Sequence, residues 1–399
     1  MPSVKYLNPT RLSVFITHPI QYQAPVWRML AQTPNLDLIV HFFSDHSVRG
    51  GMDTGFGVGV AWDVDLLDGY KSVFLNRTAN LSHPSEIRIP DPKSVFGERT
   101  FDWVFISGYT HGFERQVLRL KKRFGYRVVM RGEFSDERGG VHANGLKGCL
   151  RSLARDAYLR RFYQHIDSFG VIGSAARLHL SRLGVSSARQ FQSPYNVDTD
   201  LFEKQVRHFR REACRRELGI TEDRFVVLFS GKFIPRKAPM LLLEAVTRIP
   251  AKDRVTLILV GDGELRTEME QRFRPILGNK LIMPGFVNQS QLGRYFAAAD
   301  VFVLPSEFET WGLAVNEAMQ FSLPVIVSNR VGCRHDLVIP GKTGDIFTFG
   351  DVDGLRVRLE AFIQNLGWVQ GLGANCRRHI QQYSSQCAAN GLLKAIGMV

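Results

Sequence analysis

Short apolar runs rich in β-branched residues alternate with helical patterns along this chain, and the alternation restarts near its middle. Neighbouring parallel strands need a crossover between them, usually a helix, so this rhythm predicts parallel sheets covered by helices. In the first half we expect strands at 12–17, 38–43, 103–107, 127–130 and 170–172, and helices at 25–31 and 113–124. In the second half we expect strands at 225–230, 256–260, 281–283, 301–305 and 324–328, and helices at 240–248, 264–273, 291–298 and 313–321.

A polar segment, residues 193–200, separates the two series and is followed by a charged helical stretch. The 399 residues also exceed what one ordinary core accommodates. We therefore predict an α/β protein with two Rossmann-like domains, residues 1–200 and 201–375, that face each other across a cleft. Residues 376–399 are predicted to form a helical tail that packs back on the N-terminal domain.

The composition is that of a globular protein, because 44% of the residues are hydrophobic and 22% are charged. No run of roughly 18 apolar residues is present, so no membrane span is expected. Residues 1–11 lack the apolar stretch of a secretory signal, and the five cysteines are widely spaced without a Cys-x-x-Cys motif. These features favour a cytoplasmic protein with free thiols in a reducing compartment and without a zinc site.

Positive charge is concentrated in one segment of a chain whose formal net charge is +13. Residues 115–161 contain thirteen Lys and Arg against four Asp and Glu. One interpretation is a solvated basic face. The other is a surface for phosphate or anionic lipid, where each basic residue contributes roughly 1 kcal/mol, and we predict such peripheral contact with a membrane or lipid-phosphate acceptor. Nucleic acid is not expected as a partner, because the segment carries no recognisable nucleic-acid module and no stacking array of aromatic residues.

Residues 301–319 join a buried strand to a helix through a loop, and the segment carries two acidic side chains. The loop ends at Gly312, and the helix begins near Leu313. The first N–H groups of a helix lack intrahelical partners, so this junction suits an anion, and glycine lets a phosphate approach closely. Glu309 precedes the helix and Glu317 lies about one turn inside it, within reach of ligand hydroxyl groups. Alternatively, these acidic residues only complement the helix dipole.

The two glutamates, with seven residues between them, resemble the E-x7-E motif of glycosyltransferase family 4. The resemblance covers most of residues 220–350, through the segments FSGKFIPRKAP (229–239), LVGDGE (259–264), PGF (284–286), ADVFVLPS (299–306) and PVIVS (324–328). It implies the GT-B fold, with a nucleoside diphosphate sugar as the donor substrate, held mainly by the C-terminal domain. It also implies retention of the anomeric configuration, without a cofactor or a catalytic metal.

The resemblance assigns donor-binding roles position by position. Glu317 is expected to hydrogen-bond the donor ribose, and Glu309 to contact the sugar hydroxyls at the reactive face. Lys232 stands where the family commonly has arginine, Lys237 matches its phosphate-binding lysine, and Arg236 is a competing candidate. Cations at these positions would stabilise the departing diphosphate. The diphosphate and sugar are expected to rest on the backbone of Thr310, Trp311, Gly312, Leu313, Ala314 and Val315.

Candidates in the first half follow expected strands, where the fold places the loops of the cleft. His18 is expected to contact the acceptor or the diphosphate, with a packing or capping role as the alternative. His111 is the nearest candidate for a histidine that many family members place beside the donor sugar, although its local spacing departs from their motif. Arg131 and Glu133 follow the next strand and are expected to line the acceptor side.

Weaker motifs lie outside this set. The Gly-rich stretch 50–59 and residues 62–63 resemble variable acceptor-side loops of some family members. The GDG sequence at 261–263 lacks the third glycine of a dinucleotide-binding motif, because Arg266 occupies that place. Three acidic pairs imitate metal-binding sequences, but such pairs are common by chance and no metal site is expected at Asp63 and Asp65, Asp198 and Asp200, or Asp351 and Asp353.

These residues predict a retaining hexosyltransferase-type enzyme that moves a sugar from a nucleoside diphosphate sugar to a glycan or lipid-linked acceptor. Cell-surface polysaccharide or glycolipid synthesis is the expected setting. One alternative is a GT-B-fold epimerase, which would convert the donor without any acceptor. Another is a nucleotide-sugar-binding protein that has lost catalysis and binds its ligand without transfer.

Overall fold

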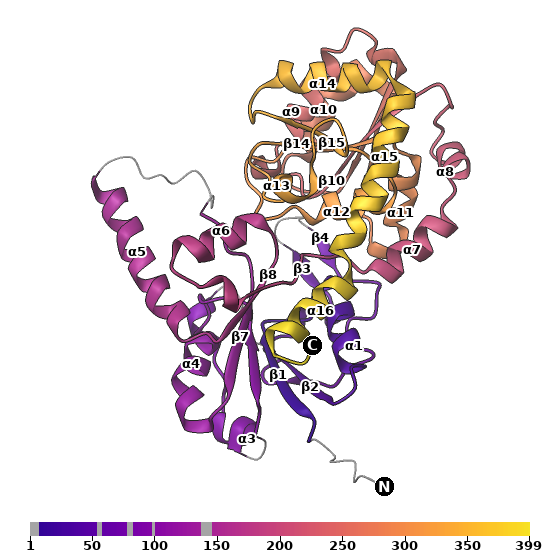
Figure 1. The fold of residues 1–399 in the computed structure, drawn as a ribbon. Helices are drawn as coiled ribbons and strands as arrows, with labels where there is room; N and C mark the ends of the chain where they lie inside the picture. The colour runs from indigo at the N-terminus through magenta and orange to yellow at the C-terminus, as the bar shows by residue number, and fades with distance from the viewer. Residues whose placement is uncertain (1–7, 54–57, 78–82, 98–99, 137–145) are drawn as a thin grey trace.

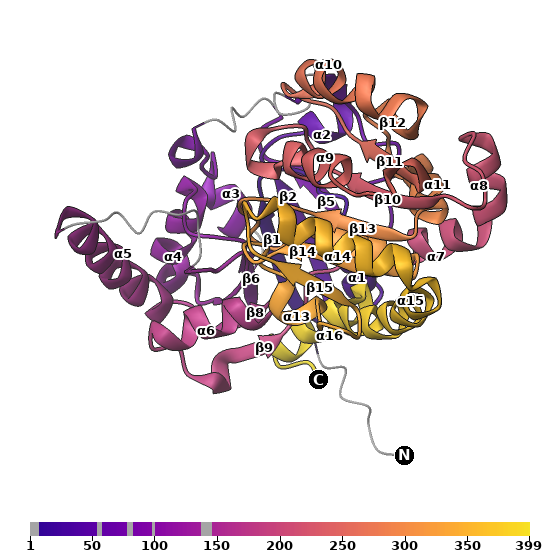
Figure 2. The ribbon, with the colours of Figure 1, turned by 90° about the horizontal axis from the view of Figure 1, so that it is seen from above.

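The structure, a computed structural model, describes residues 8–53, 58–77, 83–97, 100–136 and 146–399. Two α/β domains stand one above the other in Figure 1, and each contains a parallel sheet with helices on its faces (Figures 1 and 2). The alternation of apolar runs and helical patterns predicted this arrangement, and the prediction is confirmed.

The N-terminal sheet has seven parallel strands in the order β5-β2-β1-β6-β7-β8-β9. The strands are β1 (Thr10–Ile16), β2 (Leu36–Phe42), β5 (Ser72–Phe74), β6 (Trp103–Ile106), β7 (Arg127–Arg131), β8 (Ser168–Val171) and β9 (Gln190–Gln192). A separate antiparallel pair consists of β3 (Gly51–Asp53) and β4 (Val58–Val60). The helices of this domain are α1 (Ala24–Ala31), α2 (His46–Arg49), α3 (Pro92–Gly97), α4 (Gly112–Phe124), α5 (Leu146–Gln164) and α6 (Ser174–Arg182).

The C-terminal sheet has six parallel strands in the order β12-β11-β10-β13-β14-β15. The strands are β10 (Phe225–Ser230), β11 (Val255–Val260), β12 (Leu281–Gly285), β13 (Val301–Leu304), β14 (Val325–Ser328) and β15 (Gly344–Phe347). Four of them, β10, β11, β13 and β14, are almost wholly buried, as their continuous apolar sequences require. The helices are α7 (Thr199–His208), α8 (Arg211–Glu217), α9 (Pro239–Thr247), α10 (Arg266–Leu277), α11 (Gln289–Ala298), α12 (Leu313–Gln320), α13 (Arg334–Leu337), α14 (Val352–Gln364) and α15 (Leu366–Ile380).

Strand order reverses beside the first strand of each sheet. In the N-terminal sheet the chain leaves β1 towards β2 on one side and later returns to β6 on the other. The C-terminal sheet repeats this around β10, with β11 on one side and β13 on the other. Loops that leave neighbouring strands in opposite directions open a crevice at the carboxyl ends, which is where open α/β sheets bind ligands.

The last helix, α16 (Ser385–Ala395), returns to the N-terminal domain and packs on α1 and β9 (Figure 1). Ala388 and Leu392 join a buried cluster with Val26 of α1. Gly391 permits this contact, because an added Cβ would lie 1.9 Å from the carbonyl oxygen of Gln192. The predicted return of the C-terminal tail is confirmed.

The expected elements are present, with small shifts at their ends. The predicted helix 264–273 is α10, which begins at Arg266 and continues to Leu277, because Leu277 is buried and holds the last turn although Pro275 lies inside the helix. Strands β5, β9 and β15 were not predicted. They are three or four residues long, and their partners in the sheet stabilise them more than their own sequences do.

All five cysteines are free, and three of them, Cys214, Cys333 and Cys376, are buried. Within the described parts of the chain, no helix combines the length and apolar character needed to cross a bilayer.

Candidate active site

A cleft of about 460 Å³ lies between the two domains, at the carboxyl ends of both sheets. Gln21, Trp62 and Glu133 form its N-terminal wall. Of the predicted donor-binding residues only Val315 is missing from the cleft, because its side chain lies in the core. The others line it together: Lys232, Arg236, Lys237, Glu309, Thr310, Trp311, Gly312, Leu313, Ala314 and Glu317.

The loop between β13 and α12 turns at Gly312, whose φ is +104°. An added Cβ would meet Leu304 Cδ2 at 3.0 Å, so both the backbone conformation and the space favour glycine. The N–H group of Val315 donates to the Gly312 carbonyl at 2.9 Å and starts the helix. The N–H groups of Leu313 and Ala314 precede this bond, where a helix offers no internal acceptor. The junction therefore presents two donors and the positive end of the helix dipole to the cleft.

Glu309 is held in place by side chains on two sides. Its carboxylate forms an ion pair with Lys237 and accepts a hydrogen bond from Ser306 Oγ, which lies 3.0 Å from Glu309 Oε1. Arg236 reaches the same loop and donates from Nη1 to the Phe308 carbonyl at 3.1 Å. Only 9% of Glu309 is exposed, so the orientation of its carboxylate is fixed before any ligand binds.

Glu317 is half-buried and lines both the cleft and a neighbouring cavity of about 60 Å³. Burial raises the pKa of its carboxyl group to about 7, and a hydrogen bond with Gln289 and the charge of Lys237 oppose this effect in part. Both protonation states are therefore populated near neutral pH. A ligand that donates hydrogen bonds to the carboxylate shifts the group towards its ionised form.

Trp311 borders the cleft, but its indole ring belongs to the contact between the domains. The ring is 4% exposed, and Nε1 donates to Asn316 Oδ1 at 2.8 Å. Its centroid lies 5.8 Å from that of Tyr195. Gly173 of the N-terminal domain makes room for the ring, because an added Cβ there would lie 2.3 Å from Trp311 Cζ3. The side chain of Trp311 therefore joins the domains.

Glu133 of the N-terminal wall is held by a chain of hydrogen-bonded tyrosine side chains. Tyr195 donates from its hydroxyl to Glu133 Oε1 at 2.7 Å, and the Tyr22 hydroxyl lies 3.1 Å from that of Tyr195. Burial, together with the charge of Glu133, raises the pKa of Tyr22 to about 12, so its hydroxyl keeps its proton. Arg131 is buried and donates to the backbone carbonyls of Ser193 and Pro194, at 3.1 and 2.7 Å. These two residues begin the linker between the domains, residues 193–200. Arg131 thus holds the linker and also lines a smaller cavity of this domain, and Glu133 lines both that cavity and the cleft.

The two histidine candidates occupy different environments. His111 lines a second cavity of about 220 Å³, with its Nδ1 3.3 Å from Oε1 of the fully buried Glu114. His18 lines neither this cavity nor the cleft and packs against His46, with ring centroids 4.4 Å apart. Burial lowers the pKa of His18 to about 4, and the charges of His46 and His111 add to the shift, so its ring is neutral. Glu133 lines both the second cavity and the cleft and connects them.

Residues 61–68 form a loop that reaches from the N-terminal domain to the C-terminal one. Trp62 lines the cleft, with its ring centroid 6.4 Å from that of Phe286. Asp63 accepts hydrogen bonds from the N–H and hydroxyl groups of Ser290 at the start of α11. The sequence predicted residues 62–63 as part of an acceptor-side loop, and no local signal indicated their contact with the C-terminal domain. Residues 54–57 of the Gly-rich stretch before them lie outside the described residues.

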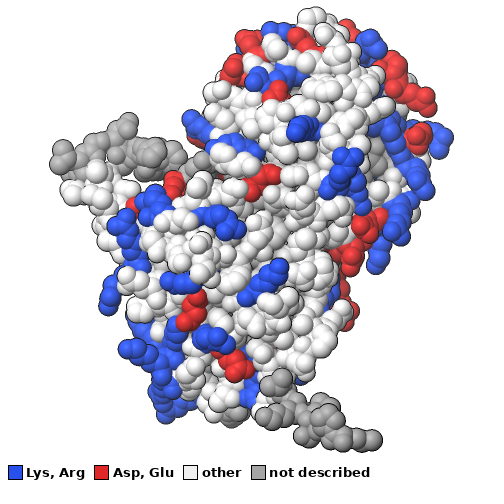
Figure 3. Space-filling view, viewed as in Figure 1, with Lys and Arg blue, Asp and Glu red and all other residues white. Residues whose placement is uncertain are grey.

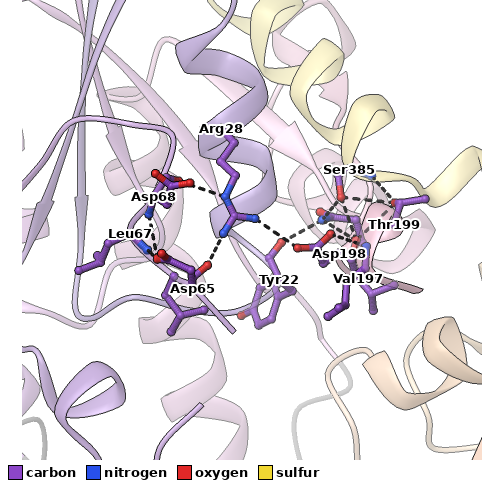
Figure 4. A network of polar contacts seen from close by, with 12 residues as sticks. Tyr22, Arg28, Asp65, Leu67, Asp68, Val197, Asp198, Thr199 and Ser385 are labelled. Carbon is purple, nitrogen blue, oxygen red and sulfur yellow. Dashed lines mark hydrogen bonds and ion pairs between the residues drawn. The ribbon is translucent and has the colours of Figure 1, made fainter. Parts of the chain in front are cut away.

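Arg28 of α1 fixes the other end of this loop (Figure 4). Its Nε donates to the Asp68 carbonyl at 3.1 Å, and a second N–H donates to the carbonyl of Asp65. Nη1 lies 3.3 Å from Oδ2 of Asp198, the residue that caps α7. Ser385 of α16 adjoins this network and donates to the linker backbone at 2.8 Å. One guanidinium group thus joins α1, the loop and the domain linker.

One member of each acidic pair has a local structural role, and Asp63 makes the contact with Ser290 already described. Asp65 accepts hydrogen bonds from the next backbone N–H groups of its loop, and Asp198 and Asp351 cap α7 and α14. Among the residues that the structure describes, no three or more His, Cys, Asp or Glu side chains are grouped to hold a metal ion.

Residues 210–379 match the family model of group 1 glycosyl transferases. The chain is 28% identical over 234 residues to the sulfoquinovosyl transferase SQD2 of Arabidopsis thaliana, covering 57% of this chain and 44% of that protein. It is 30% identical over 165 residues to the UDP-Gal:alpha-D-GlcNAc-diphosphoundecaprenol alpha-1,3-galactosyltransferase of Escherichia coli, covering 40% and 41%. The matches span less than half the length of these curated relatives.

The architecture also matches solved structures along almost the whole chain. Sucrose-phosphate synthase of Thermosynechococcus elongatus superimposes with a TM-score of 0.74 at 18% identity, covering 96% of this chain and 98% of that one. At this identity the likeness concerns the fold, which is GT-B. The family match covers the domain that holds the two glutamates and the three cationic side chains of the cleft.

Proposed function

We propose that this protein, whose residues 210–379 form a domain of the group 1 glycosyltransferase type, transfers a sugar from a nucleoside diphosphate sugar to a hydroxyl group of a glycan or lipid-linked acceptor. One observation carries the proposal: the open N-terminus of α12, three cationic side chains and two glutamates share one cleft at the switch point of the C-terminal sheet. A nucleotide sugar presents the complementary chemistry, an anionic diphosphate between two rings that carry hydroxyl groups.

The cleft orders the parts of such a donor. The diphosphate lies at the N–H groups of Leu313 and Ala314, beside the charge of Lys232. The ribose then reaches Glu317 inside the helix, where its hydroxyl groups donate to the carboxylate. The base extends beyond the ribose towards the wall formed by Phe286 and Trp62.

The sugar lies on the other side of the diphosphate, at Glu309 and Lys237. In the proposed reaction the bond from C1 to the diphosphate oxygen breaks, and the acceptor oxygen bonds to C1 on the same face. The proton of the acceptor hydroxyl passes to the departing phosphate, so the anomeric configuration is retained. Lys232, Arg236 and the N-terminus of α12 stabilise the charge that develops on the leaving group, and we propose that no metal is needed.

The acceptor approaches from the N-terminal domain, where Glu133 lines both cavities and His111 lines the second. The name of the Escherichia coli relative describes an acceptor linked to diphosphoundecaprenol, which supports a lipid-linked acceptor here. Such a lipid places the enzyme at the cytoplasmic face of a membrane, in cell-surface polysaccharide or glycolipid synthesis. The basic segment 115–161, of which residues 137–145 lie outside the described residues, provides the positive charge for that contact.

A panel of UDP-, GDP-, ADP- and TDP-sugars tests this function, with thermal shift and diphosphate release as readouts. Glu309→Ala and Glu317→Ala should each lower turnover at least about tenfold, the scale of one transition-state contact. Glu307→Ala is the matched control, because Glu307 lies in the same loop but is half exposed and pairs with Arg330 outside the cleft. Wild-type turnover in both cleft variants would refute the assignment.

Two other outcomes separate the alternatives. Conversion of the donor sugar in the absence of any acceptor would indicate an epimerase. Saturable donor binding without diphosphate release, in the presence of glycan and lipid-linked acceptors, would indicate a protein that only binds nucleotide sugars.

The proposed absence of a catalytic metal is tested with a metal chelator. Turnover should be unchanged after this treatment if the cationic side chains of the cleft are enough to stabilise the leaving diphosphate.

A further inference from the structure

Helix α5 has a second apolar face that the fold does not use. Its buried residues, Leu159, Phe162 and Tyr163, all lie in the C-terminal part and pack on the N-terminal domain. The N-terminal part extends away from the rest of the domain, at the left of Figure 1. There Leu150 is 60% exposed and Leu153 is 61% exposed. These are large apolar side chains on a segment that contributes little to the core.

Leu150, Leu153 and Ala157 share one exposed side of the helix, because they follow one another at intervals of three and four residues. Tyr158 is 47% exposed but belongs to a different side: it lies about 80° from Leu150 around the helix, and its ring centroid is 6.1 Å from that of buried Phe162. At 100° per residue, Leu159 points in the direction opposite to Leu150, so the exposed face is turned away from the packed one. Packing on the core therefore explains the apolar face of α5 that carries Leu159, but it does not explain the exposed apolar face that carries Leu150.

Exposed arginines lie beside this apolar face. Arg151 lies about 100° from Leu150 around the helix, and Arg160 and Arg161 lie at the C-terminal end of the face. Arg155 points further away and pairs with Asp136 and Asp156. Neighbouring helix α4 adds exposed basic residues, and Figure 3 shows Lys and Arg side chains gathered along the lower left edge of the molecule, over α4 and the lower part of α5. A helix with leucines on one face and arginines at its margins matches the chemistry of an anionic lipid surface, where both groups gain favourable contacts.

The position of α5 is fixed and adjoins the acceptor cavity. Asp156 of α5 forms ion pairs with Arg182 of α6, which orients the exposed half of the helix. Tyr109 lines the cavity of about 220 Å³ beside His111 and its ring centroid lies 6.1 Å from that of Phe162 in α5. A surface on which α5 rests is therefore close to the place where an acceptor enters.

We propose that the N-terminal half of α5 docks on an anionic lipid bilayer, with Leu150 and Leu153 inserted at the boundary between headgroups and acyl chains. The arginines contact lipid phosphates. Docking through α5 would orient the protein so that a lipid-linked acceptor reaches the second cavity. This consequence of docking rests on the proposed transferase function. The docking itself requires neither donor nor catalysis.

Vesicle co-sedimentation tests the docking. Wild-type protein should bind vesicles of phosphatidylcholine with about 30% phosphatidylglycerol, and bind vesicles of phosphatidylcholine alone at least about tenfold more weakly. The double variant Leu150→Asp/Leu153→Asp should lose at least about tenfold of its binding to the anionic vesicles, and Arg151→Glu/Arg161→Glu should do the same. Both variants should melt as the wild type does, because the altered side chains are exposed.

Val357→Asp and Arg207→Glu are the matched controls, with 51% of Val357 and 82% of the Arg207 side chain exposed on the C-terminal domain. Both should bind vesicles as the wild type does. The proposal is overturned if wild-type protein ignores anionic vesicles, or if Leu150→Asp/Leu153→Asp binds them unchanged. It is also overturned if that variant turns a wild-type dimer into a monomer, since the face would then bind a second copy.

Donor turnover by the same variants, with an acceptor in solution, keeps the two proposals apart. Docking stands and the transferase function fails if the wild type binds anionic vesicles but releases no diphosphate from any nucleotide sugar. The transferase function stands and the docking proposal fails if the wild type turns over a nucleotide sugar but does not bind anionic vesicles. The expected result is vesicle binding that depends on α5, together with soluble turnover that does not.

Discussion

Replacement of Glu317 by glutamine removes a cleft carboxyl group whose ionisation is opposed by its burial in the protein. Burial raises its pKa from 4.5 to about 7. At about 1.4 kcal/mol per pKa unit, this shift corresponds to at most roughly 3 kcal/mol of opposed ionisation. Glu317 also faces the cleft, where water screens part of the effect, so we expect about 1–2 kcal/mol.

The sign of the effect follows from the direction of the shift. The folded protein binds the proton more tightly than the unfolded chain, so the stability associated with Glu317 is fully present below its usual pKa and is lost as pH rises through about 7. Glu317→Gln removes this loss. Without ligand, the variant should therefore melt higher than the wild type by roughly 3–6 °C at about pH 8, and by less at about pH 5.

Donor binding should change in the opposite sense. Ribose hydroxyls donate to the ionised form of Glu317, so the Kd of the wild type for its nucleotide sugar should rise about tenfold between about pH 8 and about pH 6, as the carboxylate takes up its proton. Both phosphates of a nucleotide sugar are diesterified and do not titrate in this range. Glu317→Gln should bind about tenfold more weakly at about pH 8, with little dependence on pH.

Isothermal titration of the donor at several pH values, beside thermal melts of the empty protein, measures both effects. Glu307→Gln serves as the control, because its carboxylate lies in the neighbouring loop outside the cleft. The reasoning is refuted if the glutamine variant keeps the pH profile of the wild type, or if the wild-type Kd is constant across the range.

Three further changes test other parts of the site. Gly312→Ala places a Cβ in a backbone conformation with φ of +104° and 3.0 Å from Leu304, so it should lower stability by at least about 1 kcal/mol and donor affinity at least about tenfold. Trp62→Ala removes the ring that faces Phe286, and we expect a Kd for the donor about tenfold higher with little change in melting temperature. Arg28→Ala opens the contact between loop, helix and linker, and should lower the free energy of unfolding by about 1–3 kcal/mol in a denaturant titration.

Each change has a counterpart elsewhere in the chain. Gly341→Ala also meets a positive φ, +71°, but open space, and should leave donor binding unchanged. Trp368→Ala removes a ring that is 42% exposed on α15, and should not alter the Kd. Arg207→Ala removes a largely exposed guanidinium and should leave stability within about 0.5 kcal/mol. Equal effects within any pair would contradict the explanation given for that position.

The residues on the C-terminal side of the cleft could be predicted from the sequence because their pattern is local. A buried strand, a glycine turn and a helix start lie within one continuous segment, and the two glutamates are carried by that segment. The sequence assigned only the backbone of Trp311 to the donor cradle and did not indicate that its ring fills space left by Gly173 in the other domain. A contact of this kind depends on how the two domains pack against each other, and the sequence near Trp311 does not indicate that packing.

Contacts between distant segments also explain why the roles of several residues in the N-terminal domain could not be predicted from the sequence. Arg131 follows a strand and lines the second cavity, and its guanidinium also holds the domain linker, a contact that the sequence did not indicate. His18 follows another strand, and its neutral ring packs against His46, while a contact with an acceptor or a diphosphate stays a prediction. The hydrogen bond between Arg28 and Asp198 joins segments that are 170 residues apart in the sequence. Only folding brings Asp198 close to Arg28.

The return of α16 to the N-terminal domain has a consequence for synthesis of the chain. Residues 385–395 complete a core whose other members are made near the beginning, including Val26. While the ribosome is still adding the C-terminal domain, α1 and the edge of the first sheet keep an uncovered apolar surface. The N-terminal domain therefore cannot finish folding first, and a chain released before residue 385 should expose this surface to chaperones and proteases.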